Sequence, residues 1–340
     1  MIKTLSIIIP SYNMEEYLDQ CLSSLVVSRI NDLEIIIVND GSIDKTRELA
    51  EKWHEKFPNS IKVINKDNGN YGSCINWGIK EATGQYIKVL DADDSFEQQN
   101  LDEFICFLKQ SVADVIISDY LIVDEIGNVS DVHSFHENGL DGDFDKCLPM
   151  LMKDTIEMHA ITYKSEIFRR FEYHQTEGIS YTDQEWMFMP MAQVNTIAVF
   201  PKTVYRYLIG RIGQTVNPAM AYKNVNQLII VMEKILRDYV DNLQDRTSSH
   251  NKYMYGRIIK KLPSIYRILL LKSKGKERDR NLIAIDNYIF KFCPLLYQDL
   301  ESQIIGFMPY HYIRNWRKCG HKGSILLSCW QFIINLVLRY

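Results

Sequence analysis

The chain has 340 residues, 46% of them apolar, which is enough to bury a sizeable core in one large domain with an appendage. Its seven cysteines, an odd number without a C-x-x-C pair, argue against a disulfide framework or a zinc site and favour reduced thiols in the cytoplasm. The net charge of -4 is unevenly spread: residues 250–340 hold 16 Lys and Arg against 5 Asp and Glu, so a basic final third could meet nucleic acid or anionic lipid, while the acidic remainder argues against a nucleic-acid binder as a whole.

The N-terminal segment, MIKTLSIIIPSYN, has an apolar run that ends at Pro10, too short for the hydrophobic region of a signal peptide or for a membrane span. It is expected to form a buried first strand. Short β-branched runs then alternate with amphipathic stretches, which predicts repeated βαβ units and a mostly parallel sheet. The predicted strands are 5–9, 33–38, 61–64, 86–90 and 114–118, and the predicted helices are 14–28, 44–56, 71–82 and 98–110.

The pattern changes after residue 118. Residues 119–149 contain glycines among acids and are expected to form a hairpin or another excursion, and residues 155–207 return to mixed strands and helices. After Pro218 the pattern is helical, with the charged run KSKGKERDR at 272–280 as a loop or boundary. The predicted division is a domain at 1–217, with halves at 1–118 and 119–217, and a helical, basic region at 218–340.

Polar side chains follow three of the predicted strands, in IIIPSYN, IIIVNDGSIDKT and KVLDADD. Because an open α/β sheet binds ligands at the carboxyl ends of its strands, these segments are expected to form a binding site along one rim. A nucleotide there needs a wall for its base, a carboxylate for uracil or ribose, and a divalent ion for its diphosphate. The candidates are Ser11, Tyr12, Asn13, Asp40, Gly41, Ser42, Asp91, Asp93 and Asp94.

The DADD segment, residues 91–94, is the most informative of the three. Two aspartates separated by one residue at a strand end point to the same side, so Asp91 and Asp93 can serve the ribose and a metal ion. Mg²⁺ and Mn²⁺ prefer such oxygen ligands, and the ion stabilises a departing nucleoside diphosphate. The alternative is that Asp91 and Asp94 only cap the turn and the following helix.

Taken together, SIIIPSYNMEEYLDQCLSSL, EIIIVNDGSIDKT and NGNYGSCINWGIKEATGQYIKVLDADD resemble the N-terminal half of glycosyltransferase family 2 over about residues 4–110. The order and spacing of the family's motifs are kept, and the combination is highly specific. The resemblance implies the GT-A fold, a Rossmann-like α/β domain whose mostly parallel central sheet is flanked by helices. It also implies inverting, metal-dependent transfer of a sugar from a nucleotide-diphosphate donor.

The same resemblance implies a set of donor-binding residues. Asp91 would lie at the ribose, and Asp93 would be the ligand of a Mg²⁺ or Mn²⁺ ion. Gly72 would permit close packing in a segment that approaches the nucleotide. The base would be surrounded by Pro10, Ser11, Tyr12 and Asp40, and the full expected donor site is Pro10, Ser11, Tyr12, Asn13, Asp40, Asn68, Gly72, Asn76, Asp91, Ala92, Asp93 and Arg211.

Inverting transfer needs one general base that takes the proton of the acceptor hydroxyl as its oxygen attacks the anomeric carbon. The segment EGISYTDQEWMFMP at 177–190 resembles the family segment in which an acidic residue opens a helix beneath the donor sugar. By that resemblance Asp183 is the catalytic base, although Thr182 precedes it where the commoner pair has an acid. Glu185 has a structural explanation, because Thr182 as N-cap with Glu185 three residues later fits a capping box.

The segment VYRYLIGRIGQTVNP at 204–218 stands where family members carry a mobile, often basic loop over the donor. Arg211 either contacts the diphosphate, since a guanidinium fork suits phosphate oxygens, or is a solvated loop residue. No histidine stands where some relatives place a further metal ligand. His159 is either an acceptor contact or a buried core histidine, and Tyr71 and Trp77 are interpreted as helix packing.

The basic C-terminal region has two segments with a membrane-like composition. Residues 252–274 interleave aromatic, aliphatic and basic residues, as a helix on an anionic membrane surface does. Residues 323–340 carry no charge before Arg339 but are interrupted by Gln331 and Asn335, which favours an interfacial or reentrant anchor over a membrane span. We therefore expect a cytoplasmic protein, peripheral on the cytoplasmic face of the plasma membrane; the alternative is that these helices pack against protein.

These observations predict an inverting, metal-dependent hexosyl- or N-acetylhexosaminyltransferase. By resemblance the donor is a UDP-sugar, and the basic region makes a lipid-linked saccharide of a surface polysaccharide the expected acceptor. A processive synthase is disfavoured because the Q-x-x-R-W motif and multiple spans are missing from the sequence. A sugar nucleotidyltransferase would show a glycine-rich, basic loop after the first strand, whereas PSYNMEE is neither; an inactive GT-A scaffold subunit would lack the carboxylates that are present here.

Overall fold

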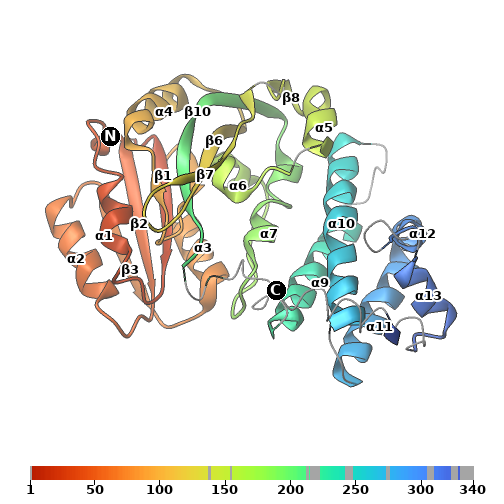
Figure 1. Cartoon of the computed structure of the whole chain (residues 1–340). Helices are drawn as coiled ribbons and strands as arrows, with labels where there is room; N and C mark the ends of the chain where they lie inside the picture. Colours follow the sequence, from red (N-terminus) through yellow and green to blue (C-terminus); the bar gives the residue numbers. More distant parts are fainter. Residues whose placement is uncertain are drawn as a thin grey trace. The chain divides into compact units, whose positions relative to one another are not determined.

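The structure, a computed structural model, describes residues 2–136, 139–153, 155–211, 214, 223–241, 248–272, 276–304, 310–322 and 328–329. The chain divides into two units, Met1–Gln214 and Thr215–Tyr340, and each is described by itself (Figure 1). The domain boundary predicted at residues 217 and 218 falls outside the described residues.

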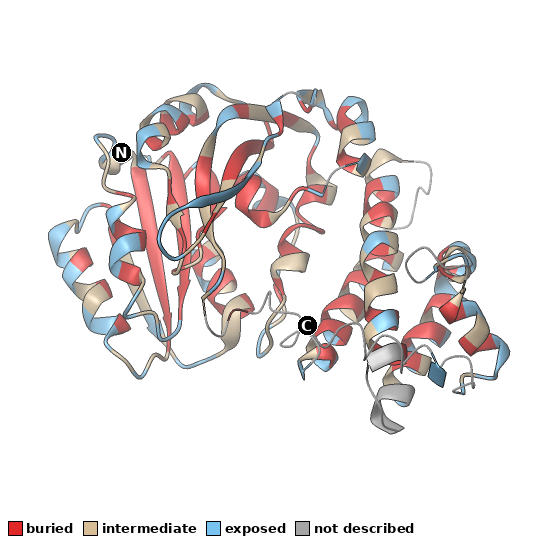
Figure 2. Ribbon diagram, viewed as in Figure 1, coloured by how far each residue is buried: buried red, intermediate tan, exposed pale blue. Residues whose placement is uncertain are grey.

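The first unit is built on a sheet with the strand order β3-β2-β1-β4-β9-β6-β10-β5. Its first four strands are parallel, and β1 and β2 are buried at every position (Figure 2), which explains their nearly continuous apolar sequences. Helices α1 and α2 cover one face of these strands and α3 covers the other (Figure 1). The bounds are β1 Leu5–Ser11, β2 Leu33–Asp40, β3 Ile61–Lys66, β4 Tyr86–Val89, α1 Leu18–Ser23, α2 Thr46–Lys56, α3 Asn70–Glu81 and α4 Gln98–Gln110, with a 3-10 turn at Ile30–Asp32.

Helix α1 is much shorter than the predicted helix at 14–28. The residues before it are tied to the loop that follows β2, because the backbone N–H of Met14 donates to Thr46 Oγ1 at 2.7 Å and that of Glu15 donates to Asp44 Oδ2 at 3.1 Å. These bonds hold the chain in turns where an amphipathic pattern alone favours helix. The result is a rigid junction between the carboxyl ends of β1 and β2.

The second half of the sheet is mixed, which differs from the mostly parallel sheet that was predicted. Strand β9 lies antiparallel between β4 and β6, while β10 runs parallel to β6. Residues 119–149 do contain a hairpin, formed by β6 and β7, whose turn is held by the Asp124 carboxylate. The bounds are β5 Ser95–Phe96, β6 Val115–Val123, β7 Val129–His133, β8 Gly142–Asp143, β9 Ile161–Lys164, β10 Thr196–Leu208, α5 Phe144–Lys153, α6 Glu166–Arg170 and α7 Asp183–Trp186, with 3-10 turns at Met158–Ala160 and Met191–Gln193.

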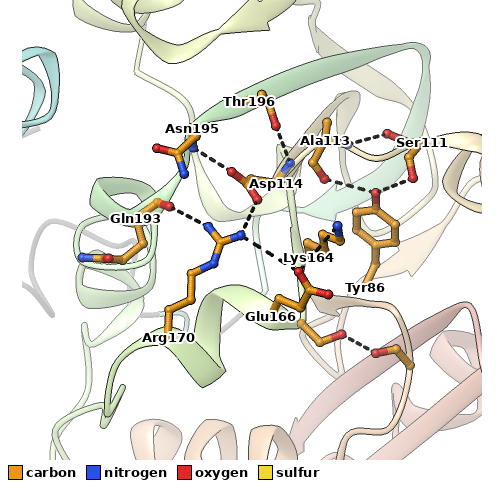
Figure 3. Close-up of polar contacts among 12 residues, drawn as sticks. Tyr86, Ser111, Ala113, Asp114, Lys164, Glu166, Arg170, Gln193, Asn195 and Thr196 are labelled. Atoms are coloured by element: carbon orange, nitrogen blue, oxygen red, sulfur yellow. Dashed lines mark hydrogen bonds and ion pairs between the residues drawn. The ribbon is translucent and has the colours of Figure 1, made fainter.

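A buried carboxylate joins the elements on this side of the sheet (Figure 3). Asp114 precedes β6 and is 6% exposed; its Oδ2 accepts from the backbone N–H of Asn195 at 2.8 Å, and its Oδ1 lies 3.3 Å from Arg170 Nη2 of α6. The second acidic partner of Arg170, Glu166, lies 4.0 Å away and is exposed. The ion pair of Arg170 with Asp114 is therefore stronger than its ion pair with Glu166.

Strand β4 contains a fully buried lysine. Lys88 Nζ donates to the carbonyl oxygens of His159 at 2.7 Å and Ile161 at 3.2 Å, and it forms no ion pair among the described residues. Burial without a carboxylate lowers the pKa of Lys88 from 10.5 to about 7. This lysine fixes the 3-10 turn Met158–Ala160 beneath the end of β4.

The second unit is helical, as predicted for the chain after Pro218. Its helices are α9 Val225–Asp241, α10 Ser249–Arg267, α11 Lys276–Phe292, α12 Pro294–Glu301 and α13 Tyr312–Lys318, with a π-helical turn at Ile268–Lys272. The prediction that the charged run 272–280 is a loop was wrong from Lys276 onward, because α11 begins there. At the centre of the unit, buried Asp286 accepts from Tyr266 Oη at 2.5 Å and from Arg317 Nη2 at 2.6 Å.

The segment expected to lie on a membrane surface, residues 252–274, forms most of α10. Its large apolar residues, including Tyr253, Ile258 and Leu262, are buried where α10 packs on α9 and α12, so packing against protein replaces the predicted lipid contact. None of the described helices combines the length and apolar character that crossing a membrane requires. Apart from Ser328 and Cys329, the segment 323–340 lies outside the described residues. Both Cys319 and Cys329 are free and exposed rather than core thiols.

We predict that Asp114→Ala lowers the free energy of unfolding by about 2–4 kcal/mol, because it leaves the Asn195 N–H and the Arg170 guanidinium without their buried partner. Glu166→Ala removes the exposed partner of the same arginine and should cost about 0.5 kcal/mol. Urea unfolding of the two variants measures both values. Equal losses would show that the Asp114 network does not organise this side of the sheet.

We also predict a pH-dependent stability term from Lys88. Its folded pKa lies below its unfolded value, so between pH 7 and 10 the unfolded chain binds more protons and the wild-type free energy of unfolding rises relative to Lys88→Met. The slope of this difference is at most about 1.4 kcal/mol per pH unit, and it vanishes below pH 6. Urea unfolding from pH 6 to 9 measures it, with exposed Lys202→Met as control. Parallel profiles for wild type and Lys88→Met would contradict the assignment.

Candidate active site

Three aspartates form a tight turn directly after β4. The N–H of Asp94 donates to the carbonyl of Asp91 at 2.9 Å, and the two carboxylates are held by tyrosines: Tyr71 Oη donates to Asp91 Oδ1 at 2.8 Å and Tyr205 Oη donates to Asp94 Oδ2 at 2.5 Å. Asp94 Oδ1 also accepts from the N–H of Leu208 at 2.7 Å. Asp94 is therefore fixed by β10, and the alternative that it only caps the following helix does not describe its contacts.

The charge of this turn is only partly compensated. Burial, followed by the repulsion of Asp93, raises the pKa of both Asp91 and Asp94. Among the described residues one cation reaches the turn, Arg211, whose Nε lies 2.8 Å from Asp93 Oδ2. A site with this excess of buried carboxylate oxygens suits a hard divalent cation.

His159 adds a neutral nitrogen to the same place. Its ring is buried and stacks on Tyr207 at a centroid distance of 4.1 Å, and its Nδ1 is buried without a hydrogen-bond partner. Burial and the nearby Lys88 lower the pKa of His159 to about 3, so the ring stays neutral at physiological pH. His159 is thus buried, as one of the two interpretations predicted. Its Nδ1, however, lacks the hydrogen bond that a core histidine is expected to make.

The ligand atoms of Asp91, Asp94 and His159 lie within 4.8 Å of one another, so these residues fit a metal ion. The predicted metal ligand, Asp93, is not part of this group, because its carboxylate faces Arg211. Among the described residues, the structure thus brings together Asp91, Asp94 and His159 as candidate ligands, next to the predicted ligand Asp93. The sequence reasoning missed His159 as a potential ligand, since nothing in the local sequence at 159 reveals that it meets residues 91–94.

The ends of β1 and β2 form the other side of the predicted donor site. Asp40 is 2% exposed and accepts from the N–H of Gly69 at 2.9 Å and from Lys66 Nζ. Asn13, in the left-handed region with φ 54°, receives the N–H of Ile43 on its side-chain oxygen at 3.0 Å. The other predicted residues here are Pro10 and Ser11 in β1, Tyr12, which is 45% exposed, and Asn68, whose side chain donates to the carbonyl of Asp40 at 3.0 Å.

Two residues expected to approach the nucleotide, Gly72 and Asn76, contact the loop before α7. A Cβ on Gly72 would lie 2.0 Å from the carbonyl oxygen of Thr176, so this glycine admits the loop before α7. Asn76 holds the same loop, because its Nδ2 donates to the carbonyl of Gln175 and its Oδ1 accepts the N–H of Gln175 at 2.8 Å. Both residues position the loop that leads to Asp183.

Asp183 is the first residue of α7, as predicted, and its charge contributes to the raised pKa of Asp91. The predicted capping box is wrong. The backbone of Thr182 is helical, its Oγ1 accepts from Gln175 Nε2 at 2.9 Å, and Glu185, 1% exposed, accepts the N–H of Thr176 at 3.0 Å. Glu185 is thus structural for a different reason: it anchors the 175–178 loop beneath Asp183.

A cavity of about 280 Å³ opens beside Asp93. Its wall comes from α1, from the turn between β6 and β7 and from the end of β10, and Arg206 in that wall is paired with Glu97 at 2.9 Å. Trp77, interpreted as packing, is 40% exposed, whereas Tyr71 serves the aspartate turn. The lining residues are Glu16, Tyr17, Gln20, Asp93, Ser95, Val123, Asp124, Glu125, Gly127, Arg206 and Leu208.

The fold is shared with a solved structure, that of S. aureus TarS 1-349 in complex with UDP-GlcNAc, with a TM-score of 0.70 over 96% of this chain and 89% of that chain. The sequence identity is 18%, so this likeness concerns the fold, which is the GT-A fold expected from the resemblance. The predicted α/β architecture with helices flanking a central sheet and a helical C-terminal region is confirmed.

Curated relatives match between about a third and three quarters of this chain. The uncharacterized glycosyltransferase EpsJ of Bacillus subtilis is 40% identical over 124 residues, which are 33% of this chain and 36% of EpsJ. The minor teichoic acid biosynthesis protein GgaB of the same organism is 25% identical over 259 residues, 73% of this chain and 28% of GgaB. The chain therefore spans about a third of the length of these relatives. The family model for glycosyl transferase family 2 matches residues 6–171, just under half of the chain, and this region is similar to that family.

Proposed function

We propose that this chain is an inverting, metal-dependent glycosyltransferase that moves a hexosyl or N-acetylhexosaminyl group from a UDP-sugar to an acceptor hydroxyl. The observation that carries the proposal is the buried turn Asp91–Asp94, together with Asp183 at the start of α7, whose charge contributes to the raised pKa of Asp91. A metal-binding carboxylate turn next to a separate carboxylate is what transfer with one general base requires. The UDP-GlcNAc in the TarS complex supports the choice of donor class.

The residues divide the work as follows. Asp40, Ser11 and Tyr12 form the wall for the base at the ends of β1 and β2, and Asp91, presented by Tyr71, accepts from the ribose. Asp93 would hold the divalent ion, which when bound supplies the positive charge that stabilises the departing diphosphate. Asp183 takes the proton of the acceptor hydroxyl. One proton transfer and one displacement at the anomeric carbon complete the reaction, with inversion.

For the acceptor we propose a lipid-linked saccharide of a surface polymer, reached by a protein peripheral on the cytoplasmic face of the membrane. The net positive charge of the C-terminal region supports attraction to an anionic surface, and GgaB supports an anionic polymer context. Because α10 is buried by neighbouring helices, such attraction would act through surface charge.

The test is calorimetric titration of wild type, Asp93→Asn and Asp183→Asn with UDP, with and without Mn²⁺, followed by transfer assays. We expect wild type to bind UDP only with Mn²⁺ and Asp93→Asn to bind at least about tenfold more weakly, since a divalent ligand is lost. Asp183→Asn, the matched control, should bind UDP like wild type yet lose about 100-fold or more in transfer rate, because only the base is removed.

Each variant can contradict a different part of the proposal. Metal-independent UDP binding that Asp93→Asn leaves intact would remove Asp93 from the metal site. Full transfer activity in Asp183→Asn would remove it as the base. No binding of UDP, GDP or dTDP by wild type would replace the enzyme proposal with a scaffold role for the GT-A domain.

A further inference from the structure

The ion pair between Arg211 and Asp93 is partly buried and supported by neighbouring side chains. Nε of Arg211 lies 2.8 Å from Asp93 Oδ2, and the two side chains are only 20% and 10% exposed. The guanidinium also lies over the ring of Tyr17, 5.2 Å from its centroid. Gln214 supports the arrangement, because it accepts the N–H of Gly210 at 3.0 Å and donates to the carbonyl of Leu208 at 2.6 Å.

This pair neutralises the one aspartate of the turn that has no other strong partner. Asp91 and Asp94 are held by the phenol groups of Tyr71 and Tyr205, whereas Asp93 has Arg211 and a long 3.5 Å contact from Gln214. Among the described residues no second basic side chain pairs with the turn. Arg211 therefore pairs with the carboxylate that the proposed function assigns to the divalent ion.

A guanidinium and a divalent ion exclude each other at this carboxylate. An ion about 2 Å from a carboxylate oxygen and a guanidinium within hydrogen-bond distance of the same oxygen would repel strongly in a partly buried site. We propose that Arg211 is an internal counter-ion that holds the place of the metal at Asp93 while no donor is bound. The inference rests on the proposed function and adds that the metal ion and Arg211 compete for the carboxylate of Asp93.

The competition has a consequence for the order of events. Arg211 lowers the affinity of the empty site for metal alone, so free metal is a poor ligand. A metal ion that arrives with a nucleoside diphosphate brings phosphate oxygens, which suit the released guanidinium. Arg211 thus weakens the binding of free metal and strengthens the binding of the nucleoside diphosphate with its metal. Removing Arg211 should therefore change these two affinities in opposite directions.

The experiment compares Mn²⁺ binding without nucleotide with UDP binding in excess Mn²⁺. Free Mn²⁺ is measured by its electron paramagnetic resonance signal in wild type, Arg211→Gln and Arg206→Gln. We expect Arg211→Gln to bind Mn²⁺ alone about fivefold or more tightly and to bind UDP at saturating Mn²⁺ more weakly. Arg206→Gln removes an equal charge from the neighbouring β10, where the partner is Glu97, and should leave the Mn²⁺ affinity within about twofold of wild type.

The outcomes separate the inference from the proposed function. If Arg211→Gln binds Mn²⁺ no more tightly than wild type, or if Arg206→Gln tightens Mn²⁺ binding equally, the counter-ion role is overturned even where wild type binds UDP with Mn²⁺. If wild type binds no nucleotide but Arg211→Gln still gains Mn²⁺ affinity, the ion pair acts as inferred and the donor proposal fails. Thermal unfolding of each variant checks that the first unit is intact.

Discussion

The mutual repulsion of three carboxylates in one four-residue turn is the constraint on which the site depends. Asp91 and Asp94 are buried beside Asp93, and both have raised pKa values for that reason. The surrounding elements place hydrogen-bond donors around the three carboxylates: the phenol of Tyr71 in α3, the phenol of Tyr205 in β10 and the guanidinium of Arg211 after β10. Without a cation, this repulsion lowers the free energy of unfolding, and a bound cation would relieve it. Binding sites typically give up some stability in this way.

The fold holds this turn by joining segments that are far apart in the sequence. Parallel pairing of β1 with β2 and β4 brings three carboxyl ends to one rim, and the antiparallel β9 carries His159 to the end of β4. The position of Asp183 depends on the loop at 175–178, which is fixed by Asn76, Glu185 and the absence of a Cβ at Gly72. Gly72 and Asn76, which the sequence suggests as ligand contacts, therefore also support the loop that leads to Asp183.

Local sequence patterns predicted most of the first unit. The continuous apolar runs of β1 and β2 are recognisable because both faces are covered, and the motif residues 91–94 are recognisable because they follow such a run. The contacts of Lys88 and His159 could not be predicted, because Lys88 donates to the backbone carbonyl of His159, which is 71 residues away in the sequence. The length of α1 and the start of α11 were misjudged because side-chain bonds to a distant loop and the tolerance of helices for exposed charge leave no mark in periodicity.

The most direct test of a donor site organised by this turn is a crystal structure with UDP and Mn²⁺, in which anomalous scattering locates the metal. The site as argued predicts that Asp93 would hold the Mn²⁺ ion and that the Arg211 guanidinium would move from Asp93 to phosphate oxygens. A Mn²⁺ ion bound by Asp91, Asp94 and His159, with Arg211 still paired to Asp93, would contradict it.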